Sequence, residues 1–288
     1  MSARVVRSVA EVRAAVAEER RRGATIGLVP TMGALHAGHG SLMDVARRET
    51  DFVVVSVFVN PIQFDRPDDY ERYPQDISSD VEFCVAHGVD LLFHPAAEDM
   101  YPAPQRAFVE VEGLTGHLCG AFRPGHFRGV ATVVLKLLNI VRPDRAYFGE
   151  KDAQQLAVIE RLVRDLNVPV QIVPVATVRE PDGLAMSSRN RRLSGPERQA
   201  ARMLSRVLFE TRERIGAGCL DAAELKREAQ AAFNSEPGLR VEYFEIVDPA
   251  EMLPVERIAA PVRVAAAVWA GSTRLIDNVL CKPPGAAR

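Results

Sequence analysis

The chain has 288 residues, of which 47% are hydrophobic, which suffices for one large domain or two compact ones and excludes general disorder. Lysine and arginine nearly balance aspartate and glutamate at a formal net charge of −2, so a nucleic-acid backbone is disfavoured as a partner. The longest apolar runs, residues 52–59 and 130–138, are too short to span a membrane, and we expect no export signal in residues 1–22. We therefore expect a cytoplasmic protein.

Helical and β-rich patterns alternate along the first part of the chain. We expect Ser8 to cap a helix that ends before Gly23, and β-rich runs over 25–31 and 52–60 enclose a helical pattern around Leu42. This order predicts a βαβ unit and hence a parallel sheet. The alternation continues with helices over 76–87, 129–141 and 153–166 and with strands over 89–93, 145–148 and 168–178.

This alternation predicts a doubly wound, Rossmann-like parallel sheet over residues 1–179, whose ligands bind beyond the carboxyl ends of the strands. After a boundary near residues 180–183 the pattern changes to consecutive helices followed by strands, which predicts a smaller α+β domain over 180–288. The helices are expected over 196–215 and 222–233, and the strands over 241–247, 262–268 and 275–280. The predicted fold class is therefore α/β.

The cysteines lie far apart without any paired spacing, so the sequence indicates neither a zinc motif nor a redox motif. We expect them to be small buried hydrophobes without a chemical role. They are Cys84, Cys119, Cys219 and Cys281.

A segment with two glycines and two histidines joins the first long predicted strand to a helix. It reads Pro30-Thr-Met-Gly-Ala-Leu-His-Ala-Gly-His39. Glycines permit close backbone approach, and the N–H groups at a helix start favour phosphate. Because His36 and His39 are three residues apart, both rings can donate hydrogen bonds to one phosphate. One alternative is that one histidine caps the helix while the other lies on the surface; another is a metal pair, for which no third ligand has convincing spacing.

A second polar segment, Met186-Ser-Ser-Arg189, follows the last strand of the predicted first domain. It lies in a loop after Asp182-Gly183 that can close over a ligand, and two hydroxyls and a guanidinium suit a polyphosphate. Taken alone, such a run is usually an ordinary helix cap. Its presence together with His36 and His39 favours a nucleotide site.

These two segments resemble the paired HIGH and KMSKS motifs of the class I synthetase and nucleotidylyltransferase superfamily. More specifically, residues 27–192 resemble the pantothenate synthetase family. The matching segments are residues 29–39, Phe58-Val-Asn-Pro-Ile-Gln63-Phe64, Tyr73-Pro74, Arg123-Pro-Gly-His126-Phe127 and Phe148-Gly-Glu-Lys151-Asp152-Ala-Gln-Gln155, and residues 273–278 also fit. Two departures are Gly40, where the family often has leucine, and Ala153, where an aromatic residue is common. We expect the first to loosen the helix start and the second to enlarge a pocket edge.

The resemblance implies roles for individual residues. His39, as proton donor, and His36, Lys151 and Arg189 are implied as catalytic. Gln63 is implied to bind pantoate and β-alanine, and Gln155 to bind pantoate. The other implied substrate residues are Asn60, Tyr73 and Arg123. The implied ATP site comprises Met32, Gly33, Ala34, Leu35, His36, Ala37, Gly38, His39, Gly149, Glu150, Lys151, Asp152, Val178, Met186, Ser187, Ser188 and Arg189.

The resemblance also implies a reaction: ATP-dependent condensation of pantoate with β-alanine through a pantoyl-adenylate, with release of AMP and pyrophosphate. It further implies Mg²⁺ bound with ATP, a homodimer, and a second domain that acts as a lid. The residue types agree with such a reaction, because glutamine amides orient a carboxylate without the strong ground-state stabilisation of a bidentate arginine.

Other functions remain open from the residues alone. A nucleotidylyltransferase shares the His-x-Gly-His turn but is expected to carry more cations for a second phosphate. An aminoacyl-tRNA synthetase needs an RNA-binding surface, which the near-neutral charge disfavours. A non-catalytic nucleotide sensor is expected to bind ATP without catalysing pyrophosphate exchange. Lys151, Gln63 and Gln155 each also have an ordinary interpretation as polar surface residues.

Overall fold

The computed structural model describes residues 3–102 and 104–286, which form two compact units. Unit 1 comprises Met1–Val111, Arg123–Glu150 and Val158–Ala176, and unit 2 comprises Glu112–Phe122, Lys151–Ala157 and Thr177–Arg288. Two short segments from the first part of the chain therefore belong to unit 2, which no pattern in the sequence indicated. The domain ranges 1–179 and 180–288 and the lid role of the second stay predictions.

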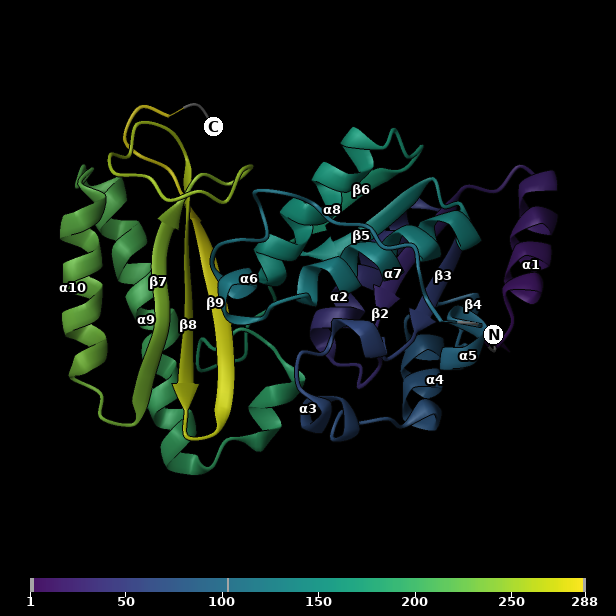
Figure 1. Ribbon diagram of the computed structural model, residues 1–288, viewed down its shortest axis with the longest axis horizontal. Helices are drawn as coiled ribbons and strands as arrows, with labels where there is room; N and C mark the ends of the chain where they lie inside the picture. The colour runs from purple at the N-terminus through teal and green to yellow at the C-terminus, as the bar shows by residue number, and fades with distance from the viewer. Residues whose placement is uncertain (1–2, 103, 287–288) are drawn as a thin grey trace. The chain divides into compact units, whose positions relative to one another are not determined.

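Unit 1 is built on a six-stranded sheet with strand order β1-β4-β3-β2-β5-β6, in which every pair is parallel (Figure 1). The strands are β1 (Arg4–Val6), β2 (Ile26–Thr31), β3 (Phe52–Val57), β4 (Leu91–Phe93), β5 (Arg145–Gly149) and β6 (Gln171–Val175). The helices of the first part of the chain are α1 (Val9–Arg21), α2 (Ala37–Glu49), α3 (Pro67–Glu71), α4 (Ile77–Ala86), α5 (Ala97–Met100), α6 (Cys119–Phe122), α7 (His126–Val141) and α8 (Ala153–Asp165), with short 3₁₀ turns η1 (Pro61–Gln63) and η2 (Glu150–Asp152). The predicted α/β class is confirmed.

The sheet of unit 1 is covered by helices that pack through apolar side chains. Leu42 and Met43 of α2 and Cys84 of α4 share one core with side chains from β2 and β3. Helix α7 packs against β2 and against α1. Strands β2 and β3 are almost continuously apolar because parallel strands are buried on both faces.

Local signals explain where several elements begin and end. Ser8 caps α1 as predicted, in a capping box with Glu11. Strand β3 ends at Val57 rather than at residue 60, because the chain turns into η1 after the Phe58 N–H bonds the last carbonyl of β2. Helix α7 begins three residues earlier than predicted, where Gly125 takes the left-handed conformation at the N-cap with φ +78.

The two edge strands of this sheet differ from the strands that the sequence predicts. Strand β1 was not predicted, because three residues that pair with only one neighbour carry little alternation. Strand β6 is shorter than the predicted range of 168–178. Pro169 and Pro174 lack the N–H that a ladder needs, and Pro174 is tolerated because β6 pairs only with β5.

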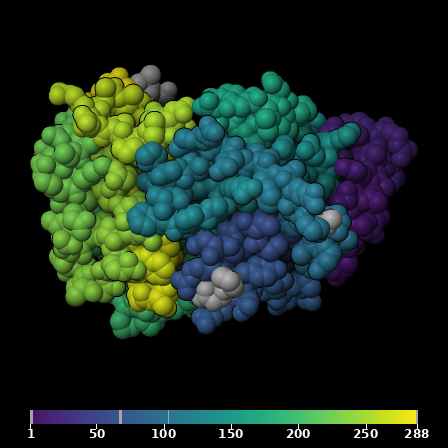
Figure 2. Space-filling model, in the orientation of Figure 1, coloured from purple at the N-terminus to yellow at the C-terminus, as the bar shows by residue number. Residues whose placement is uncertain are grey.

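Unit 2 contains a three-stranded antiparallel sheet of β7 (Leu239–Val247), β8 (Val262–Ala270) and β9 (Thr273–Cys281). Helices α9 (Gly195–Gly216) and α10 (Ala222–Asn234) pack on it through a common core that includes Leu208, Phe233 and Val264 (Figure 1). The outer side of α10, green in Figure 2, is exposed. The predicted helices and strands are confirmed, with ends that differ by a few residues.

All four cysteines are free, and Cys84, Cys119 and Cys281 are buried while Cys219 is half-buried. Burial raises the pKa of Cys84 and of Cys281 to about 12, so these thiols stay protonated at neutral pH. The burial of these three cysteines agrees with the prediction, although Cys119 also contacts the Tyr243 hydroxyl at 3.2 Å. Within the described ranges, no helix is both long and apolar enough to cross a membrane.

Candidate functional site

The turn between β2 and α2 is held open by two residues in the left-handed conformation, Gly33 with φ +80 and Ala34 with φ +51. The Asp80 carboxylate, from α4, accepts the N–H groups of Ala34 at 3.2 Å and Leu35 at 2.9 Å. A Cβ on Gly33 would lie 2.7 Å from an Asp80 oxygen, so only glycine fits here. Burial raises the pKa of Asp80, and the two backbone N–H groups act against that rise. No pattern in the sequence indicated this support of the turn.

The two histidines of the turn face each other with ring centroids 4.1 Å apart. His36 is the N-cap of α2, and its Nδ1 accepts the N–H of Gly38 at 3.2 Å. The Nδ1 of His39 accepts the N–H of His36 at 3.3 Å. Because an accepting Nδ1 carries no hydrogen, each neutral ring carries its proton on Nε2. The capping role of His36 is therefore compatible with donation from Nε2 to a bound anion.

The departure at Gly40 is accommodated by neighbouring side chains. A Cβ at this position would lie 2.6 Å from the His87 ring and 3.2 Å from Phe83. The His87 ring is held by Asp44, at 2.7 Å from Nδ1 to the carboxylate. Helix α2 runs without a break through Gly40, and a loosened helix start stays a prediction.

Gln63 lies buried in η1, directly after β3, and its amide is oriented by a chain of hydrogen bonds. Its Oε1 accepts the Nδ2 group of Asn60 at 3.0 Å, and the same Nδ2 donates to the Gly129 carbonyl at 3.2 Å. Tyr101 donates its hydroxyl to the Asn60 Oδ1 at 2.7 Å. A backbone carbonyl can only accept, so the orientation of Asn60 follows, and Gln63 directs its own Nε2 group to the Met32 sulfur at 2.8 Å.

The Gln63 amide thus offers N–H donors, which suit a carboxylate or a hydroxyl, beside a residue of the predicted ATP segment. These N–H groups lie near the carboxyl end of the sheet of unit 1, because η1 follows β3. The β2–α2 turn and Gly149, the last residue of β5, lie at the same end of the sheet, since β3, β2 and β5 are parallel neighbours. This is where doubly wound sheets bind their ligands.

Arg123 and His126 fix the backbone of η1. The His126 Nδ1 lies 2.8 Å from the Gln63 carbonyl, and its Nε2 accepts from Arg123 at 3.1 Å. Arg123 also pairs with Asp65 at 3.0 Å. In this arrangement the Arg123 guanidinium supports η1. Tyr73, another predicted substrate residue, packs edge-on against Phe64 with centroids 5.9 Å apart.

The predicted ATP residues of unit 2 are held by backbone and amide contacts. The Lys151 carbonyl accepts the Nδ2 group of Asn278 at 2.9 Å, and the Lys151 ammonium lies 3.8 Å from the Asp152 carboxylate. Gln154 is buried and donates to the carbonyls of Leu114 at 2.8 Å and His117 at 2.6 Å. Gln155, next in α8, is half-buried.

The Met-Ser-Ser-Arg segment directly follows a short hairpin. The Met186 N–H bonds the Val178 carbonyl at 2.9 Å, which brings two predicted ATP residues together. Ser187 caps the 3₁₀ helix η3 (Ser188–Arg192) by accepting the Arg189 N–H at 3.3 Å. The capping role that such a run has in most proteins is present here too, and it fixes the backbone that carries Arg189.

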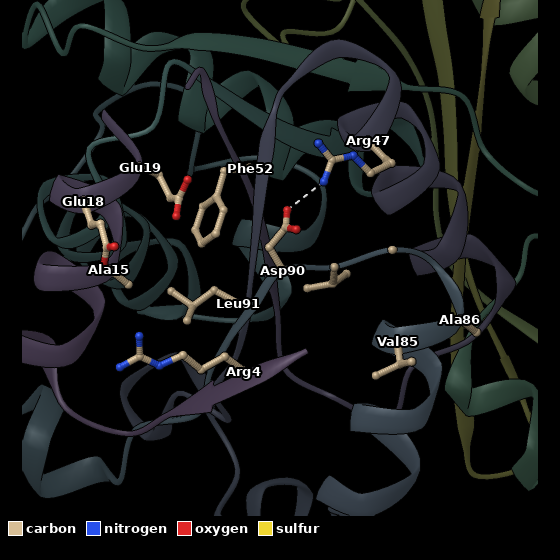
Figure 3. Close-up of a pocket in the computed structure, with 12 residues that line it drawn as sticks. Arg4, Ala15, Glu18, Glu19, Arg47, Phe52, Val85, Ala86, Asp90 and Leu91 are labelled. Carbon is tan, nitrogen blue, oxygen red and sulfur yellow. Dashed lines mark hydrogen bonds and ion pairs between the residues drawn. The ribbon is translucent and has the colours of Figure 1, made fainter. Parts of the chain in front are cut away.

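A pocket of about 770 Å³ lies at the amino ends of the strands of the unit 1 sheet (Figure 3). Arg4, Phe52 and Leu91, which line it, are the first residues of β1, β3 and β4. Arg47 and Asp90, which also line the pocket, form an ion pair at 2.7 Å. Because ligands of such folds bind at the carboxyl ends of strands, this pocket is not a candidate substrate site. Residues 3–102 and 104–286 contain no group of three His, Cys, Asp or Glu side chains suited to a metal.

Comparison with known proteins gives the family. A model described as "Pantoate-beta-alanine ligase" matches residues 4–280. The chain is 52% identical to the pantothenate synthetase of Moorella thermoacetica over 276 residues, which cover 96% of this chain and 98% of that one. It is 53% identical to the pantothenate synthetase of Heliobacterium modesticaldum, over 96% of this chain and 99% of that one.

Solved structures agree with this result. The crystal structure of pantothenate synthetase from Thermus thermophilus matches with a TM-score of 0.90 and 50% identity, covering 96% of this chain and 98% of that one. A pantoate-β-alanine ligase from Francisella tularensis, solved in complex with β-γ ATP and β-alanine, matches with a TM-score of 0.80 and 34% identity, over 97% and 98%. This chain belongs to the pantoate-β-alanine ligase family.

Proposed function

We propose that this chain condenses pantoate with β-alanine at the expense of ATP, giving pantothenate, AMP and pyrophosphate through a pantoyl-adenylate. The observation that carries the proposal is the family match, which extends over residues 4–280 with relatives about half identical across nearly the whole chain. The Francisella relative that was solved with β-γ ATP and β-alanine supports these two molecules as substrates.

In the proposed first step, the pantoate carboxylate attacks the α-phosphorus of ATP, and pyrophosphate leaves. The Nε2 protons of His36 and His39 serve to stabilise charge that develops on the phosphates, a role supported by the Nδ1 contacts of both rings. Lys151 and Arg189 serve as fixed cations for the same phosphates. The remaining residues of the proposed ATP site are the glycines and backbone groups of the β2–α2 turn, Gly149 to Asp152, Val178, and Met186 to Ser188.

Gln63 and Gln155 are the proposed orienting groups for the acid. The Nε2 group of Gln63 is suited to this task, because its orientation is fixed by Asn60 and Gly129. In the second step the β-alanine amine attacks the acyl carbon, and AMP leaves. No protein nucleophile is needed, since holding the reactants in line can contribute about 7–11 kcal/mol.

We further propose that Mg²⁺ accompanies ATP through phosphate oxygens and waters, since the ion usually keeps several waters beside a nucleotide. The Asp152 carboxylate, about half exposed beside Lys151, is an oxygen donor of the kind this ion accepts. A cytoplasmic location is proposed because ATP is supplied there. A homodimer is proposed from the resemblance to the family.

The test is to measure AMP and pyrophosphate with ATP, pantoate and β-alanine, omitting each in turn. Pantoate alone is expected to support exchange of labelled pyrophosphate into ATP, because the adenylate forms and reverts before the amine arrives. β-Alanine is then expected to permit net AMP release. Exchange that required β-alanine would contradict the two-step order, and ATP binding without any exchange would favour a nucleotide sensor.

A further inference from the structure

Strand β9 carries two adjacent buried polar residues, Asp277 and Asn278, which are 3% and 6% exposed. The proposed reaction steps use neither of them. Successive residues of a strand point to opposite faces of the sheet, so the two side chains serve different surroundings. Asn278 contacts Lys151, which is proposed to bind ATP, and Asp277 contacts Arg179, the neighbour of the proposed ATP residue Val178.

Asn278 fixes the backbone at Lys151. Its Oδ1 accepts from the Arg263 guanidinium at 2.5 Å, and its Nδ2 donates to the Lys151 carbonyl at 2.9 Å. A guanidinium only donates and a backbone carbonyl only accepts, so the orientation of the amide is determined. Arg263 is itself 8% exposed, so its contact with Asn278 is shielded from water, whereas the contact with the Lys151 carbonyl is part-buried.

Asp277 fixes the hairpin that leads to the Met-Ser-Ser-Arg segment. Its carboxylate receives two hydrogen bonds from Arg179, at 2.7 and 3.0 Å. Arg179 also donates to the Gly183 carbonyl at 3.1 Å and lies over the Phe209 ring at 4.7 Å. Because Arg179 bridges to Ala185 across the hairpin, the carboxylate holds both strands of this turn.

We propose that Asp277 and Asn278 are positioning residues, which hold Lys151 and the hairpin carrying Val178 and Met186 in one fixed arrangement before ATP arrives. This inference rests on the proposed function, in which both segments bind the nucleotide. Preorganised groups stabilise developing phosphate charge without rearranging during the reaction. A displacement of about 1 Å at such groups can cost about a hundredfold in rate.

The variant Asn278→Asp tests this directly. The carboxylate keeps an acceptor for Arg263 but replaces the donor to Lys151 with an oxygen that repels its carbonyl. We expect pyrophosphate exchange at saturating ATP and pantoate to fall by about 10–100-fold, with the pantoate KM unchanged. Asn278→Ala, which adds no charge, is expected to give a smaller fall in the same direction.

A double-mutant cycle with Lys151→Ala separates positioning from general damage. If Asn278 acts through Lys151, adding Asn278→Asp to Lys151→Ala is expected to lower the exchange rate by less than about twofold further. A matched control is Val279→Ala, which trims the next residue of β9, a buried side chain of the apolar core of unit 2. It is expected to lower the melting temperature while keeping the parental exchange rate.

The outcomes are distinguishable. Absence of exchange in the parent protein would refute the proposed function and this inference together. If Lys151→Ala lowers the rate of pyrophosphate exchange while Asn278→Asp keeps the parental rate, the inference is wrong and the proposed function still stands. The inference is also wrong if the effects of Lys151→Ala and Asn278→Asp on the exchange rate multiply in the cycle. It is equally wrong if Val279→Ala lowers the exchange rate as much as Asn278→Asp, because Asn278 would then contribute only to general stability.

Discussion

The supports of Gln63 in unit 1 and of Lys151 in unit 2 use different chemistry for the same task. The side-chain amide of Gln63 is oriented by neutral groups, from Tyr101 through Asn60, although the Arg123–Asp65 pair supports the backbone of η1. Around Lys151 the contacts include one buried charge, the Arg263 guanidinium on Asn278, and the hairpin of the same unit is held by the ion pair of Arg179 with Asp277. Neutral contacts fix which atom of an amide faces a ligand, whereas a buried ion pair fixes where a backbone segment lies and is costly to break.

This difference predicts distinct phenotypes. Loss of a neutral contact near Gln63 is expected to alter the use of substrate with little effect on folding. Loss of a charge near the hairpin of unit 2 is expected to appear first in stability, because the partner guanidinium stays largely buried without its carboxylate.

Asp277→Ala is expected to have the largest effect. It leaves the Arg179 guanidinium, whose side chain is 20% exposed, without its bidentate partner. Breaking such a pair typically costs about 3–5 kcal/mol in the free energy of unfolding. Urea unfolding of the variant measures this loss. A loss below about 1 kcal/mol would show that the pair behaves as an ordinary surface ion pair.

His39→Ala is expected to lower the rate of adenylate formation by about 10²–10³-fold, the cost of losing one preorganised donor to a developing anion. Its contact with the His36 N–H is neutral, so the free energy of unfolding is expected to change little. Single-turnover adenylate formation at saturating ATP and pantoate isolates the chemical step.

Cys84→Ala is the control for this variant, since Cys84 lies in the core of unit 1 outside every proposed motif. It is expected to lose some stability and to keep the parental rate of adenylate formation. A folded His39→Ala protein that formed the adenylate at the parental rate would remove this histidine from the mechanism.

Gly129→Ala is expected to disturb Gln63 through the backbone. A Cβ at Gly129 would lie 2.4 Å from the Ile62 carbonyl and 2.6 Å from the Gln63 Cα, so α7 and η1 must move apart. Such overpacking typically costs about 1–3 kcal/mol in stability. We expect the pantoate KM to rise while the ATP KM stays near its parental value, as steady-state kinetics can show. Equal changes in both constants would place the damage outside the Gln63 contacts.

The sequence was informative where a motif is local. The turn after β2, η1 after β3 and the Met-Ser-Ser-Arg segment were all recognisable, because each keeps its residues within about ten positions of one another. The α/β class followed from the alternation of helices and strands. The roles of the individual site residues stay predictions until variants are measured.

The supporting residues were not predictable, because their partners are distant in the chain. Asp80 contacts a turn more than 40 positions away, and Asn278 contacts Lys151 across 127 positions. An isolated aspartate or asparagine carries no pattern of its own that would reveal such a contact. The same holds for segment 112–122, whose place in unit 2 depends on contacts such as Gln154 with the carbonyls of Leu114 and His117.

Tyr101→Phe is expected to have the smallest effect, and it is the sharpest test of the neutral hydrogen bonds that run from Tyr101 through Asn60 to Gln63. It removes the hydroxyl that donates to the Asn60 Oδ1, while the Gly129 carbonyl still accepts from Asn60. Loss of one neutral hydrogen bond is worth about 0.5–1.5 kcal/mol, which corresponds to a rise of up to about tenfold in the pantoate KM.

The orientation of Asn60 is expected to survive in this variant, so Gln63 still presents its Nε2 group and kcat is expected to stay within about twofold of the parent. Burial raises the pKa of Tyr101, so its hydroxyl stays protonated at neutral pH and the comparison does not depend on titration. Asn60→Asp provides the contrast, because a carboxylate cannot donate to Gln63 and forces that amide to turn its Nε2 inward. Steady-state kinetics in which Tyr101→Phe and Asn60→Asp were equally impaired would show that Tyr101, rather than the Gly129 carbonyl, determines how the amide chain is oriented.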